Sequence, residues 1–103
     1  GETPEKARYS FVNELDPQTS VAWLEAVLAK EPANHRALLY TLANYVKINQ
    51  PYIYGEKMTQ HFISYTMLLE ILPEEELKMY VPIFDSIQNI MWRWGLIKNK
   101  VKL

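Results

Sequence analysis

Apolar residues recur along the chain at helical spacing, and prolines mark where the helical segments begin and end. Thr3–Pro4 and Asp16–Pro17 each pair a residue typical of the N-cap with a proline at the first helical position. Glu31–Pro32 ends the segment that follows Asp16, because the residue before a proline avoids helical geometry. The pattern predicts a helix after Thr3, a second after Asp16 and a third over about 33–48, and it contains no strand alternation.

The same signals divide the second half of the chain. Residues 49–55 are predicted to be the longest non-helical stretch, because Pro51 and Gly55 interrupt the periodicity. A helix over about 57–72 is apolar nearly all round, which is typical of a helix at the centre of a bundle. Pro82 is expected to break or kink the helix that starts after Pro73, and Gly95 to cap the last helix. The predicted fold class is all-α, a compact bundle of five or six short helices in a single domain spanning residues 1–103.

Composition narrows the function more by exclusion than by indication. The chain has 103 residues, 49% of them hydrophobic, and a net charge of -1, so it lacks the basic footprint of a nucleic-acid-binding protein. It has no cysteine, which excludes thiolate chemistry and fits the reducing cytoplasm, and no apolar run long enough to span a membrane. Because it starts at Gly1 and not at Met, we expect a domain cut from a larger protein. The lysine-rich tail, residues 98–103, is expected to be a solvated terminus.

Each candidate for chemistry has a simpler structural interpretation. Glu74, Glu75 and Glu76 are consecutive, and positions that diverge by about 100° on a helix cannot converge on one ion, so they favour a helix start. Neither His35 nor His61 has a glutamate or histidine three or four residues after it, which favours structural or surface roles. No serine lies in a nucleophile elbow. We therefore predict no catalytic residue, no metal site and no cofactor.

Surplus aromatic residues are the best candidates for function. Tyr52 and Tyr54 lie in the predicted loop, where they either fold back onto the core or face a partner. Trp92 lies off the apolar stripe of the last helix, next to Arg93, and such a pair either anchors an interface or packs in a second core layer. We predict that these four residues bind a protein partner.

The chain also resembles the C-terminal half of the Rho GTPase-activating (RhoGAP) domain, an all-α family, over residues 8–97. The resemblance rests on the segment from Leu28 to Leu42, with its Pro32-Ala-Asn34 punctuation before a leucine stripe, and on Lys57-Met58-Thr59 at a helix start. The chain departs from the family after Thr59, where Gln60-His61-Phe62 replaces the family's Asn and Phe-Gly-Pro turn. A second resemblance, from Trp23 to Tyr45, is to one tetratricopeptide helix pair, but no period of about 34 residues follows.

The catalytic arginine finger of the RhoGAP family lies in an N-terminal loop that has no counterpart in this sequence. Since that arginine stabilises the transition state of phosphoryl transfer, the resemblance implies an inactive or truncated module that still binds a small GTPase. We therefore predict a non-catalytic, helical protein-interaction domain that uses an exposed aromatic surface, with the RhoGAP-like module as the alternative. A homodimer is a further expectation, because a second copy would cover the surplus apolar side chains.

Overall fold

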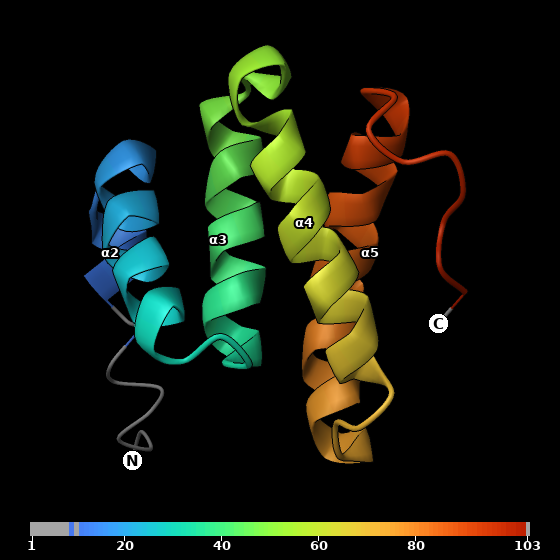
Figure 1. The fold of residues 1–103 in the computed structure, drawn as a ribbon. Helices are drawn as coiled ribbons and strands as arrows, with labels where there is room; N and C mark the ends of the chain where they lie inside the picture. Colours follow the sequence, from blue (N-terminus) through green and yellow to red (C-terminus); the bar gives the residue numbers. More distant parts are fainter. Residues whose placement is uncertain (1–8, 10, 103) are drawn as a thin grey trace.

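A computed structural model describes Tyr9 and residues 11–102 of the chain. Within this range the chain forms a short 3₁₀ helix, η1 (Phe11–Glu14), and four α-helices: α2 (Pro17–Lys30), α3 (His35–Ile48), α4 (Pro51–Leu69) and α5 (Glu74–Arg93). The α-helices run alternately down and up, and the tail after α5 turns back beside it (Figure 1). The predicted all-helical fold is confirmed. The helix expected after Thr3 lies largely outside the described residues.

The centre of the bundle is α3, and not α4 as the sequence predicted. The backbone of α3 lies close to those of α2, α4 and α5. Ala37 and Leu39 of α3 are fully buried on opposite sides of the helix, whereas Ile63 and Met67 of α4 are exposed. An all-round apolar helix is therefore not the centre of this bundle, and part of its apolar surface faces solvent.

Side-chain caps start the two helices of the first half. The Asp16 carboxylate accepts hydrogen bonds from the backbone N–H (2.9 Å) and the hydroxyl (2.7 Å) of Thr19, and Pro17 follows as the first residue of α2. The Asn34 side-chain oxygen accepts from the N–H of Ala37 at 3.1 Å and caps α3 in the same way. These caps satisfy N–H groups that have no partner inside a helix, which confirms the start predicted after Asp16 and places that of α3 at His35.

The predicted loop over residues 49–55 is wrong, because α4 begins at Pro51. Asn49 adopts the left-handed conformation, with φ of 56°, and ends α3. The chain reverses there within two residues, and Pro51 takes the first-turn position, where its missing N–H is not needed. The tyrosines expected in a loop are therefore on the first turn of a helix.

The predicted break at Pro82 is also wrong, since α5 is one continuous helix from Glu74 to Arg93. Pro82 and Lys78, whose carbonyl would accept the missing hydrogen bond, are both exposed, so solvent can satisfy that carbonyl. The unbroken α5 takes the place of two predicted helices, and the helix expected after Thr3 lies largely outside the described residues, so four α-helices are described in place of five or six.

Gly95 ends α5 as predicted. It adopts φ of 79°, and the N–H groups of Gly95 and Leu96 donate to the carbonyls of Trp92 and Met91, which is the Schellman pattern. The cap reverses the chain, so that residues 97–102 run back beside α5 (Figure 1).

Aromatic rings fill the space between α4 and α5. Phe84 of α5 stacks on Phe62 and Tyr65 of α4, with ring centroids 5.2 and 5.0 Å apart. All three side chains are buried. The two backbones are joined through these rings, and they do not approach each other as closely as each approaches α3.

Candidate interaction site

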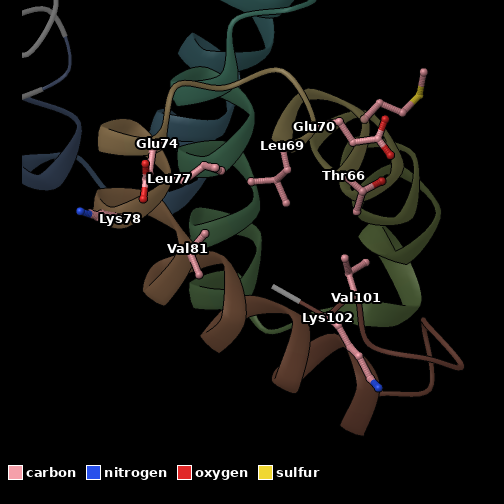
Figure 2. Close-up of a pocket in the computed structure, with 10 residues that line it drawn as sticks. Thr66, Leu69, Glu70, Glu74, Leu77, Lys78, Val81, Val101 and Lys102 are labelled. Atoms are coloured by element: carbon pink, nitrogen blue, oxygen red, sulfur yellow. The ribbon is translucent and has the colours of Figure 1, made fainter.

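A groove of about 680 Å³ opens between the C-terminal half of α4, the N-terminal half of α5 and the tail (Figure 2). It exists because the aromatic stack separates the two helices, while the short turn from Glu70 to Pro73 holds them together at one end. Its lining residues are Thr66, Met67, Leu69, Glu70, Glu74, Leu77, Lys78, Val81, Val101 and Lys102.

The groove has an apolar floor and charged ends. Leu69 is buried, and Leu77 and Val81 are half-buried on the facing helix. Glu70 and Glu74 lie toward the turn between the helices, and Lys102 lies at the opposite end with the tail (Figure 2). Lys78 also lines the groove one turn after Glu74, so this end carries two carboxylates and one ammonium group, and a ligand with an apolar centre and a basic group there would match its net charge.

Large apolar side chains on the outer wall of α4 extend this surface. Met67 is 67% exposed, and Ile63 is also exposed one turn earlier on the same side of the helix. Tyr52 lies about three helical turns before Ile63 and therefore on the same face. Tyr52 is fully exposed.

The four residues predicted to bind a partner are at one end of the bundle, because α4 begins where α5 ends (Figure 1). Leu96, just after α5, packs tightly on Gly55 of α4. A Cβ atom added to Gly55 would lie 2.7 Å from the Cδ2 atom of Leu96. The aromatic residues Tyr52 and Trp92, on the two helices next to this contact, are thus brought to the same end.

These four residues do not share one environment. Tyr52 and Arg93 are exposed, and Trp92 is 48% exposed with the Lys100 ammonium 4.9 Å from its ring centroid. Tyr54 points inward, with its ring 5.1 Å from that of buried Tyr45. Of the two alternatives for this segment, packing onto the core holds for Tyr54, whereas Tyr52 faces solvent.

Both histidines tie helices together. His61 of α4 lies 2.6 Å from the Glu25 carboxylate of α2, which also accepts a hydrogen bond from Tyr45 of α3 at 3.1 Å. His35 of α3 lies 2.7 Å from Glu76 of α5. Their positions are structural, as the sequence indicated.

The electrostatics of the Glu25 cluster keep its carboxyl ionised. Burial alone would raise the pKa of Glu25, but the hydrogen bond and charge of His61, with the Tyr45 hydroxyl, outweigh burial and hold the pKa below its ordinary value. In the part of the chain that the structure describes, no group of three acidic or histidine side chains is arranged to hold a metal ion. None of the described helices combines the length and apolarity needed to cross a bilayer.

Sequence analysis missed Gln88 and the tail. Gln88 is only 1% exposed, and its side-chain amide bonds to both backbone groups of Val101. One signal was available, since Gln88 is a polar residue one turn after Phe84 on the buried stripe of α5. The tail was expected to be solvated, but Val101 is half-buried against α5.

Comparisons with protein families, with curated proteins and with solved structures find no match to this chain. Over the residues that the structure describes, the chain is an all-helical, up-and-down bundle with an apolar groove beside its last two helices. The resemblance to the RhoGAP family stays a prediction.

Proposed function

We propose that this chain is a non-catalytic protein-interaction domain and that its partner docks on the side of the α4–α5 groove. The observation that carries the proposal is the groove itself, whose apolar floor continues onto the exposed side chains of Met67 and Ile63. Tyr52 and Trp92 extend the same side toward the other end of the bundle. This keeps the aromatic residues that the sequence indicated and adds the groove to them.

Exposure of these apolar side chains to water is unfavourable in free energy, and a bound partner would remove that cost. Burial of each large apolar side chain is worth about 1.5–3 kcal/mol, so several exposed neighbours on one face are typical of an interaction surface. Methionine and tyrosine are suited to such surfaces, because methionine adapts to irregular shapes and tyrosine provides contact area at low entropic cost. The charged ends of the groove would fix the orientation of the bound segment.

A matched pair of methionines tests the proposal. Met67 lines the groove and is 67% exposed, whereas Met79, on the other side of α5, is 60% exposed and is not part of the groove. A photoreactive phenylalanine analogue at residue 67 should crosslink a protein partner in native lysate, and the same analogue at residue 79 should not. Adding unlabelled wild-type chain should reduce the yield of the crosslink at residue 67, and adding the Met67→Glu variant should not.

Met79→Glu is the control for the competition, because it adds the same charge at a site of similar exposure. Equal crosslinking at residues 67 and 79, or none at residue 67, would contradict the proposed docking surface. Circular dichroism of both variants should match that of the wild type, since neither methionine is buried.

A further inference from the structure

The tail is attached to α5 by contacts that follow one face of the helix. Lys100 lies over the ring of Trp92. Val101 is hydrogen-bonded to Gln88, which lies one helical turn before Trp92 in α5. The tail therefore runs antiparallel to α5, from its C-terminal end toward its middle (Figure 1). The face that it follows is the groove side, because Val81 lies about three turns before Trp92 on the same side.

The side chain of Gln88 binds the backbone of the tail. The side-chain oxygen of Gln88 accepts from the N–H of Val101 at 2.9 Å, and its NH₂ group donates to the Val101 carbonyl at 3.0 Å. These are the two bonds that a neighbouring β-strand would supply to an extended residue. The NH₂ group also donates to Asp85 at 3.1 Å, which fixes the orientation of the amide. Gln88 is thus a fixed, buried receptor for extended backbone.

Around Val101, apolar and basic residues alternate along the tail, which suits an extended segment bound on one side. Val101 is half-buried and lines the groove, while Lys100 and Lys102 on either side are exposed, although Lys102 also lines the end of the groove beside the tail. Successive side chains of an extended segment point to opposite sides, so apolar and basic residues in alternation place one set on the floor and the other in solvent.

The open groove is the direct continuation of this track. Past Val101 it runs between Leu77 and Val81 of α5 and Leu69 of α4, and it ends near Glu70 and Glu74 (Figure 2). Those carboxylates complement a basic residue, and the apolar floor complements the residues next to it. The unoccupied part of the track therefore has the same chemical preference as the part that the tail occupies.

We propose that this track binds extended peptides in which lysine and apolar residues alternate, and that the tail occupies part of it as a competitor in cis. The proposal rests on the proposed function and names the ligand class of the same groove. A partner segment of this chemistry displaces the tail, and Gln88 then holds the partner's backbone in place of Val101.

The test uses a synthetic peptide with the tail's own sequence, Lys-Asn-Lys-Val-Lys-Leu, added to the ¹⁵N-labelled full chain. The tail competes at an effective concentration on the order of mM, so the wild type should bind the peptide weakly. Val101→Asp places a charge where the tail needs an apolar residue, and this variant should bind the peptide about tenfold more tightly. Amide shifts should appear at Leu77 and Val81 and in the side chain of Gln88.

Two controls separate this binding from simple charge attraction. A peptide with aspartate in place of its valine should not bind the Val101→Asp chain. Adding Gln88→Met, which keeps the volume of the side chain but removes its amide, should abolish binding of the original peptide. Equal binding with and without the Gln88 amide, or no shifts along the groove at mM peptide, would overturn the proposal.

Hydrogen exchange in the wild type provides a second measurement that needs no added ligand. The Val101 amide should exchange more slowly than the Asn99 amide, for which no hydrogen bond to Gln88 exists, and Gln88→Met should remove the difference. If the tail is not held, the two amides will exchange alike in both proteins. Failure of the peptide to bind while residue 67 still crosslinks a partner would overturn this ligand class and leave the proposed docking surface standing.

Discussion

The two halves of the bundle are packed in different ways. In the first half, α3 presents Ala37, Thr41 and Tyr45 at intervals of one turn, and Tyr45 reaches Glu25 of α2. Ala37 and Thr41 are small and fully buried, and the backbones of α2 and α3 lie close together. In the second half, the rings of Phe62, Tyr65 and Phe84 are placed between α4 and α5, and the groove lies beside them.

The difference shows how the groove arises. Rings stacked between helices fill the centre of the contact but leave its margins uncovered, whereas small side chains close the whole contact. The aromatic stack therefore has two roles, since it stabilises the second half and also keeps the floor of the groove open. Changes in the first half should affect stability alone, and changes in the stack should affect both.

Phe84→Ala should have the largest effect. The ring is fully buried between two others, so its removal should cost about 3–5 kcal/mol of unfolding free energy, measured by urea denaturation. The groove should also narrow as α4 and α5 move together, and peptide binding by the Val101→Asp chain should weaken. Phe84→Leu is the control, because it keeps part of the volume and should cost less. A loss below about 1 kcal/mol for Phe84→Ala would mean that the rings do not hold the helices apart.

Two buried tyrosines should respond to loss of their hydroxyl with opposite signs. Tyr45 donates to Glu25 at 3.1 Å, whereas the Tyr65 hydroxyl is buried and has no hydrogen-bond partner among the described residues. Burial raises the pKa of both hydroxyls, so both stay protonated. Tyr45→Phe should lower the unfolding free energy by about 1 kcal/mol, and Tyr65→Phe should raise it by a similar amount.

The two variants are each other's control, since each removes one oxygen from a fully buried ring. Thermal and urea denaturation should agree on the order Tyr65→Phe, wild type, Tyr45→Phe. If both changes destabilise the protein equally, the Tyr65 hydroxyl makes a favourable interaction, and buried hydroxyls would stabilise the two halves of the bundle alike.

Acid should weaken the link between α2, α3 and α4 by a small, defined amount. Because the pKa of Glu25 is lowered in the folded protein, its ionised form adds stability above the ordinary carboxyl pKa, and this is lost as the pH falls through the lowered value. Glu25→Gln should be less stable than the wild type by about 1 kcal/mol at pH 6, and the difference should shrink as the pH falls below the ordinary carboxyl pKa. A difference that stays constant over this range would show that the carboxylate charge is not what stabilises the cluster.

Sequence patterns predicted α2 and α3 well, but they misplaced the start of α4 and broke α5 in two. Asp16–Pro17 was interpreted correctly as a cap followed by a first-turn proline, and Pro51 plays the same part but has no capping side chain before it. Pro82 was expected to break a helix, yet it lies on the exposed side of α5, where tertiary packing on the other side maintains the helix. The sequence around Pro51 and Pro82 does not decide whether a helix begins, continues or ends there, because that depends on contacts with residues distant in sequence.

The candidate site was predictable only in part. Surplus aromatics indicated Tyr52 and Trp92, which the structure places at one end of the bundle. The groove combines α4, α5 and the tail, and its geometry follows from ring packing that no sequence window contains. The predicted partner-binding role of Tyr52, Tyr54, Trp92 and Arg93 remains a prediction.

Gly95 has a consequence beyond the end of α5. A side chain at this position would meet nothing within 4 Å, so a substitution would act through the backbone conformation alone. Its φ of 79° is one that other L-residues adopt only at a cost of about 1 kcal/mol, and it is the conformation that sends the tail back along α5. A single inherited change at this glycine would thus alter the course of the tail beside the groove without altering any residue that lines the groove.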